Sequence, residues 1–102
     1  MTEELVAKYR ARISNIIKTL GDLFGYEVSL EGKRIILRSV FAFEEDDVIV
    51  LAIEEDRTIR VEQNEFTSRF KNEKNIYLDR GKSIAAFLSA VTLSLFEQKT
   101  FQ

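Results

Sequence analysis

The sequence contains neither cysteine nor histidine, and these two absences narrow the chemistry open to it. Without cysteine there is no disulfide and no thiolate zinc site, a composition that suits a reducing compartment. Without histidine as well, the usual nucleophile–base pairs and most transition-metal sites are excluded. No apolar run approaches the roughly 20 residues that span a bilayer, and no signal-peptide core opens the chain. We therefore expect a soluble intracellular domain that is not an enzyme, holds no metal or cofactor and does not insert into membranes.

The residues that are present fit one small domain. The chain has 102 residues, of which 45% are apolar, and this is enough for a single modest core. Fifteen basic side chains stand against seventeen acidic ones, so the formal net charge is -2. A chain without a basic excess is poorly suited to bind the phosphates of nucleic acid directly. We therefore expect protein partners.

Six apolar residues of the first quarter recur at spacings of three and four, which is the pattern of a coiled coil. Gly25 follows them at the position expected of a helix C-cap. We predict a dimerisation helix over residues 1–25, continued upstream as a longer coil, in a parallel homodimer. The alternative is a helix facing the core of its own domain, which usually carries a broader stripe. The predicted dimer interface consists of Val6, Tyr9, Ile13, Ile16, Leu20 and Leu23.

The middle of the chain has the composition of β-strands. Four runs rich in β-branched and aromatic residues are separated by short polar turns, which favour antiparallel neighbours in a meander. These runs cover residues 26–30, 34–43, 48–53 and 58–63. We expect a short helix over residues 64–71 and an extended piece over 76–78 before a final helix. The predicted fold class is α+β: an N-terminal coiled-coil helix, a four-stranded antiparallel meander and a C-terminal helix.

The last twenty residues predict an unusual helix. Ser83 is a good N-cap, and five apolar residues after it share one helical face. The opposite face has Ala86, Ala90 and Leu93 in place of charges. We expect this helix to lie between the sheet and another helix, because it is apolar or small nearly all round. The residues of the first face are Ile84, Phe87, Leu88, Val91 and Leu95.

Two other motifs are better explained as structure than as chemistry. Arg80-Gly81-Lys82-Ser83 resembles the end of a phosphate-binding loop, but the required earlier glycine is replaced by Ile76. The acidic runs at 44–47 and 54–56 lack the ligand spacing and turn glycine of a calcium loop. We interpret them as solvated turns at opposite ends of the sheet.

Basic residues flank the heptad stripe, where acidic partners would normally balance them. Arg10 and Arg12 lie beside the predicted seam, with Lys8 close by. One interpretation is that their aliphatic stems pack along the coil while their charged groups stay in water. The other is an anion site for a phosphorylated peptide, because a guanidinium binds phosphate through two parallel hydrogen bonds.

Two segments carry a resemblance to a known family. Ser83-Ile84-Ala85-Ala86-Phe87-Leu88-Ser89, followed by Thr92-Leu93-Ser94-Leu95-Phe96 and Gln98-Lys99-Thr100, resembles the C-terminal end of the spindle assembly checkpoint family Mad-one (mitotic arrest deficient one). Leu23-Phe24-Gly25-Tyr26 supports the same resemblance upstream. It implies a head similar to the RWD-type domains of other kinetochore proteins, here residues 26–102, at the end of a parallel coiled-coil dimer.

The resemblance also implies a function. It predicts a non-enzymatic, homodimeric scaffold that docks at kinetochores in mitosis, located in the nucleus and, in interphase, at the nuclear envelope. Its implied partners are a phosphorylated segment of the checkpoint kinase Bub-one and, through an upstream part of the full protein, Mad-two. Thr100 matches the near-terminal threonine that the checkpoint kinase Mps-one phosphorylates in the family. The rival interpretation is another RWD-like adaptor, either a structural kinetochore subunit or a partner domain of the ubiquitin pathway.

One departure from the family concerns its phosphopeptide site. The family has an Arg-Leu-Lys triplet on the coil, whereas this chain has Glu4-Leu5-Val6 in the same place, so both charges are gone. Either the site has moved toward nearby basic residues or the interaction has been lost. The candidate residues of a moved site are Leu5, Lys8, Arg10 and Arg12.

Overall fold

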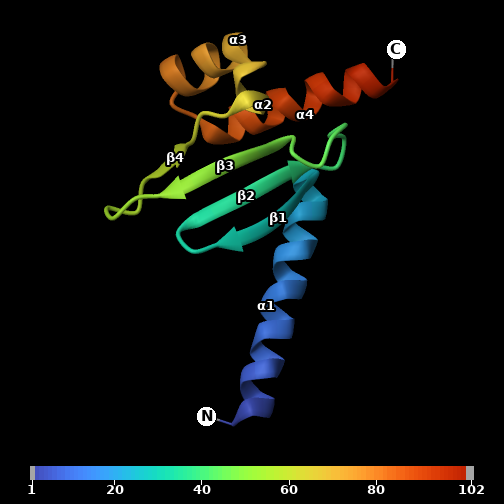
Figure 1. The fold of residues 1–102 in the computed structure, drawn as a ribbon, viewed down its shortest axis with the longest axis vertical. Coiled ribbons are helices and arrows are strands. Elements are labelled where there is room, and N and C mark those ends of the chain that lie inside the picture. The colour runs from blue at the N-terminus through green and yellow to red at the C-terminus, as the bar shows by residue number, and fades with distance from the viewer. Residues whose placement is uncertain (1, 101–102) are drawn as a thin grey trace.

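The computed structural model describes residues 2–100. Met1 of the predicted dimerisation helix, and Phe101 and Gln102 of the predicted head, lie outside that range. Its first element is a 22-residue helix, α1 (Glu3–Phe24), which projects away from the rest of the chain as a stem (Figure 1). The Thr2 side chain caps its start by accepting a hydrogen bond from the Leu5 amide. Gly25 ends it in the left-handed conformation, with φ at 81°, as the sequence predicted.

The stem leads into a four-stranded antiparallel sheet in the order β1-β2-β3-β4, which confirms the predicted meander. The strands are β1 (Tyr26–Glu31), β2 (Arg34–Ser39), β3 (Val48–Ile53) and β4 (Ile59–Val61). The register pairs Tyr26 with Ser39 at the end of the sheet nearest the stem. Gly32, at φ 61°, turns the chain between β1 and β2, where a side chain would be strained.

The second predicted strand was too long. We expected it to continue to residue 43, but β2 ends at Ser39, whose carbonyl and hydroxyl oxygens accept hydrogen bonds from Ala42 and Phe41. The chain turns there because Phe41 packs edge-on against Phe96, with ring centroids 5.4 Å apart. Likewise, β4 covers only residues 59–61 of the predicted 58–63.

Three short helical elements follow the sheet. The predicted helix over 64–71 is divided into α2 (Glu65–Ser68), capped by the Asn64 side chain, and α3 (Lys71–Glu73). The extended piece predicted at 76–78 was wrong, because these residues belong to a π-helix, η1 (Lys74–Arg80). Its wide turn is closed by a 2.9 Å hydrogen bond from the Gly81 amide to the Ile76 carbonyl. The π-helix turns Tyr77 and Leu78 toward the core.

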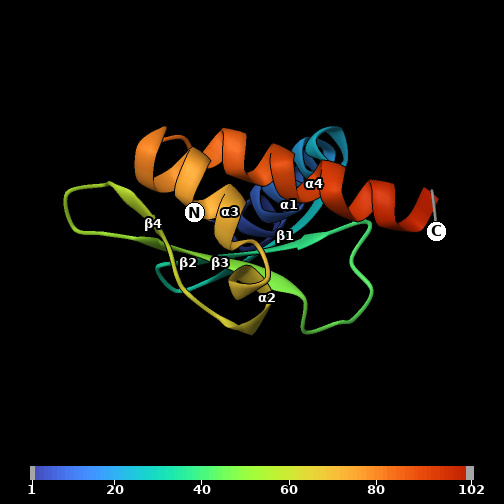
Figure 2. The ribbon, with the colours of Figure 1, turned by 90° about the horizontal axis from the view of Figure 1, so that it is seen from above.

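The last helix, α4 (Ile84–Thr100), packs along one face of the sheet, on the same side as α3 (Figure 2). The Ser83 side chain caps it by accepting a hydrogen bond from the Ala86 amide at 3.0 Å. Its predicted apolar face is confirmed as the centre of the core: Phe87 and Val91 are fully buried, while Ile84 and Leu88 are half-buried. The opposite face is only partly covered, because Leu93 remains 60% exposed. The described residues thus form an α+β fold with a projecting stem.

Candidate functional site

The six heptad residues of α1 are largely uncovered by the head, which comprises residues 26–100. Val6 is half-buried, and the other five range from 49% exposed at Tyr9 to 73% exposed at Leu23. Only Gly21 is buried in the whole helix. The stripe therefore does not face the core of its own domain, and it forms a long apolar surface of the kind that marks an interaction site. We refer to these residues, Val6, Tyr9, Ile13, Ile16, Leu20 and Leu23, as the stripe.

Gly21 explains how the stem can meet the head without using the stripe. A Cβ atom at this position would lie 2.3 Å from the carbonyl oxygen of Tyr26, so only glycine permits such close contact with the start of β1. Gly21 follows Leu20 by one residue, about 100° around the helix. The head is therefore attached beside the stripe, and the stripe remains uncovered.

The four candidate phosphopeptide residues divide between two sides of α1. Leu5, Lys8 and Arg12 lie at i, i+3 and i+7, on one flank of the stripe, and all three are exposed. Arg10 lies on the other flank and lines a cleft between α1 and β1. A single chain therefore brings three of the four residues together and separates the fourth. Among residues 2–100, none of the seven ion pairs includes Lys8, Arg10 or Arg12.

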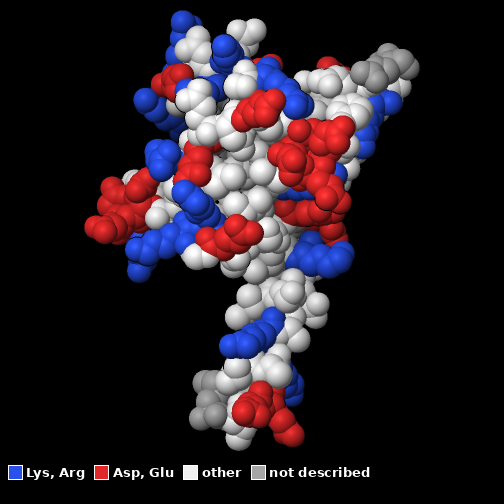
Figure 3. Space-filling model, in the orientation of Figure 1, with Lys and Arg blue, Asp and Glu red and all other residues white. Residues whose placement is uncertain are grey.

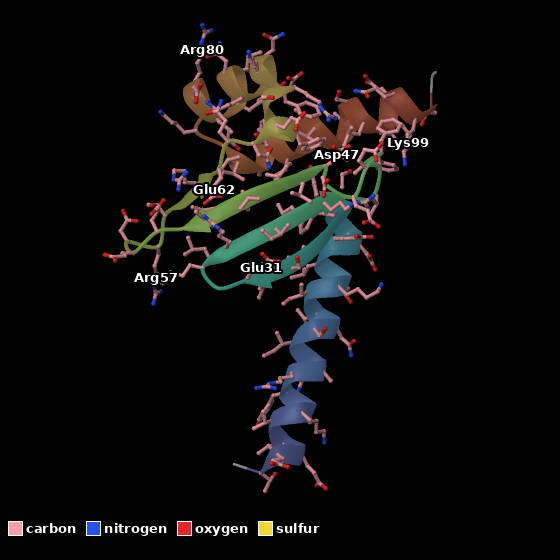
Figure 4. All side chains as sticks on the ribbon, in the orientation of Figure 1. Glu31, Asp47, Arg57, Glu62, Arg80 and Lys99 are labelled. Carbon is pink, nitrogen blue, oxygen red and sulfur yellow. The ribbon has the colours of Figure 1, made fainter. Side chains whose placement is uncertain are left out.

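The buried polar groups of the head serve the fold. The Tyr26 hydroxyl donates a 2.6 Å hydrogen bond to the Leu88 carbonyl, which ties β1 to α4. Burial raises the pKa of this tyrosine above its usual value, against a smaller lowering by the hydrogen bond with Thr92. Asp47, which Figure 4 labels, lies at one end of the sheet. Its carboxylate accepts a hydrogen bond from the Glu44 amide and lies 3.5 Å from the Arg69 guanidinium. Both groups already have their partners within the chain.

The surface around these elements is divided by charge. Charged side chains gather toward the two sides of the head, and uncharged surface continues from its middle onto the upper part of α1 in the view of Figure 3. Within residues 2–100 there is no cluster of three acidic residues arranged to hold a metal ion. No helix in the same range has both the length and the apolar character needed to cross a membrane.

A comparison with protein families decides which group the chain belongs to. A family described as mitotic checkpoint protein matches residues 16–100, which is 85 of the 102 residues. The chain belongs to the mitotic checkpoint protein family. This confirms the resemblance to Mad-one that the C-terminal helix indicated. A search of curated proteins found no match to the chain.

The extent of the family match separates the candidate residues into two groups. The part of the stripe nearest the head, Ile16, Leu20 and Leu23, lies within it, as does Thr100, which is exposed at the end of α4. The four candidate phosphopeptide residues lie upstream of the match. The family match therefore covers the head and the part of the stem nearest to it. Gly21, which lies against the start of β1, is a residue whose role the sequence analysis did not reveal.

Proposed function

We propose that this chain is a non-enzymatic, homodimeric scaffold of the spindle assembly checkpoint, which docks at kinetochores and recruits checkpoint partners in the nucleus. The observation that supports dimerisation is the uncovered stripe on α1. A helix of 22 residues, about 33 Å long, holds its apolar side chains out in water, where burying each one fully is worth about 1.5–3 kcal/mol. A second copy offers the matching surface.

A parallel arrangement also suits the charges beside the stripe. Leu5 and Arg12 each directly precede a stripe residue, Val6 and Ile13 respectively. In a parallel coil, a residue at this position faces the residue five places later in the partner. Arg12 then faces Ile17 of the partner subunit, and Leu5 faces Arg10 of the partner subunit. Neither arginine then lies directly opposite another cation across the seam.

The same arrangement would assemble a phosphopeptide site from two chains. Leu5, Lys8 and Arg12 share one flank of α1, and the flanking rule brings Arg10 of the partner subunit beside Leu5. Two guanidinium groups and one ammonium group would then surround an apolar side chain. This combination suits a phosphorylated residue followed by apolar ones. We propose that it binds the phosphorylated segment of Bub-one in place of the missing basic triplet.

Membership of the checkpoint family supports two further assignments. We propose that the full protein binds Mad-two through a segment upstream of Met1, and that Mps-one phosphorylates Thr100. Thr100 is exposed at the end of α4, where a kinase can reach it. A phosphate there would add negative charge at the end of a helix that favours positive charge, so it would loosen the last turn.

The test is a binding measurement on the 102-residue chain with a fluorescent peptide from the phosphorylated segment of Bub-one. Fluorescence anisotropy should show binding that weakens with salt and disappears for the unphosphorylated peptide. Arg10→Ala with Arg12→Ala should abolish it. The control is Lys71→Ala with Arg80→Ala, which removes the same charge from α3 and from the end of η1. Arg80 lies at the end of the head far from the stem (Figure 4). Equal binding of both peptides, or of the two double variants, would contradict the proposed site.

A further inference from the structure

A groove runs along the junction of the stem and the head. It has a volume of about 600 Å³ and lies between the last turn of α1, the sheet and α4. Leu20 and Phe24 form its wall on α1, Leu88 and Leu93 form its wall on α4, and Val28 contributes from β1. None of the residues that line it is charged. The groove is therefore suited to apolar side chains.

The few polar atoms in the groove are already hydrogen-bonded. The Ser89 hydroxyl donates to the Ala85 carbonyl at 2.9 Å, and the Thr92 hydroxyl donates to the Leu88 carbonyl at 2.9 Å. The Tyr26 hydroxyl donates to that same carbonyl. Burying a polar group costs free energy when that group has no hydrogen-bond partner. These groups keep their partners, so an apolar occupant could cover them without this cost. The groove therefore contains no polar group that needs a polar ligand as its partner.

Leu20 connects this groove to the stripe, because it belongs to both. Any helix that pairs along the stripe therefore passes the mouth of the groove. In a parallel, in-register coil, equivalent residues of the two chains lie at the same height. The last turn of the second helix would reach the level of Leu20 and Phe24. On its open side, the groove is bounded by side chains that are 66% exposed at Phe24 and 60% exposed at Leu93.

We propose that the groove receives the last turn of α1 from a second copy of the chain, with the partner's Leu23 packed against Leu93. This proposal presupposes the parallel homodimer described above and extends its interface from the stem into both heads. Each head then holds the end of the other chain's helix. The contact adds a second support to the angle between head and stem, which within one chain is set by the packing of α1 on β1 beside Gly21. It also accounts for an exposed leucine on the otherwise partly covered face of α4.

The first experiment compares two leucines with equal exposure. Leu93→Asp places a charge in the groove, whereas Leu30→Asp places it on β1, where the leucine is likewise 60% exposed but outside the groove. Sedimentation equilibrium should show the dimer Kd raised about tenfold or more by Leu93→Asp, because the carboxylate would be buried against the partner. Leu30→Asp should leave it unchanged. Equal Kd values for the two variants would overturn the proposal while leaving the dimer intact.

Disulfide formation gives a second, independent test, because the chain has no cysteine of its own. Two chains of different length are refolded together, one with Leu23→Cys and the other with Leu93→Cys, and are then oxidised. A disulfide between two Leu23→Cys chains reports the seam, and a disulfide between the unlike chains reports the groove. We expect both products. The seam product alone would overturn the groove contact and keep the homodimer, whereas neither product would refute the homodimer and the groove contact together.

Discussion

The two long helices of this chain both carry an apolar face, but only the face of α4 is covered by the rest of the chain. In α4, Phe87 and Val91 are fully buried between the sheet and the elements packed on it, whereas α1 buries only Gly21. The difference comes from what lies beside each helix. The apolar residues of α4 find partners within the chain, so they stabilise the fold. Those of α1 lack such partners in a single chain, so they are available for association.

The largest expected effect comes from the helix whose partners are internal. Phe87→Ala should lower the free energy of unfolding by about 3–5 kcal/mol, because it leaves a large cavity at the centre of the core. Urea unfolding at one fixed protein concentration would measure the loss. The control is Phe43→Ala, which removes a half-exposed ring and should have less than about 1 kcal/mol of effect. A similar loss of unfolding free energy in both variants would mean that α4 does not lie at the centre of the core.

The second prediction concerns the helix without internal partners. Ile13→Asp with Ile16→Asp places charges in the proposed seam and should convert the dimer to monomer. The circular dichroism signal of the sheet should persist, because the stem contacts the head beside Gly21 rather than through the stripe. The matched variant, Ser14→Asp with Asn15→Asp, adds the same charge off the stripe and should remain dimeric. Loss of the sheet signal in the first variant would mean that the stem and head fold as one unit.

A smaller effect is expected where the stem and head meet. Gly21→Ala would bring a methyl group to 2.3 Å from the Tyr26 carbonyl oxygen, so α1 must move away from β1. We expect a loss of about 1–3 kcal/mol despite the better helix propensity of alanine. Ser14→Ala, on the same helix, is the control and should change the denaturation midpoint little. A rise in the midpoint for Gly21→Ala would contradict the close contact.

The smallest expected effect depends on pH. Burial raises the folded-state pKa of Tyr26 above the usual tyrosine value of about 10, so the fold favours the neutral phenol. Its stabilisation is complete below the unfolded pKa and is lost as the pH rises through the folded pKa. The denaturation midpoint should therefore fall as the pH rises above about 10, and this fall should be smaller in Tyr26→Phe. Identical pH profiles for the two proteins would contradict the assignment.

The sequence predicts the elements whose patterns are local. The spacing of the stripe, the cap at Gly25 and the composition of the strands were sufficient for α1 and the meander. The π-helix escaped prediction because Ile76-Tyr77-Leu78 has the composition of a strand. Its turn depends on the hydrogen bond that Gly81 closes and on the burial of Tyr77 and Leu78. β2 ends early for a similar reason, since the contact of Phe41 with Phe96 spans 55 residues of sequence.

The candidate sites divide in the same way. The stripe follows from heptad spacing alone, and the separation of Arg10 from Arg12 follows from their positions on the helix. The groove could not be predicted from a local pattern, because it joins Leu20 to Leu93, far apart in the sequence. Only the folded chain shows that the uncovered face of α4 continues the uncovered face of α1.

The central claim is that the stripe of α1 is covered by a second copy of this chain. Sedimentation equilibrium of the unmodified chain at tens of micromolar tests it most directly, since it gives the mass of the assembly without reference to shape. We predict a mass of twice the 11.8 kDa of one chain, falling toward one chain on dilution. A mass of 11.8 kDa throughout the concentration range would contradict the claim.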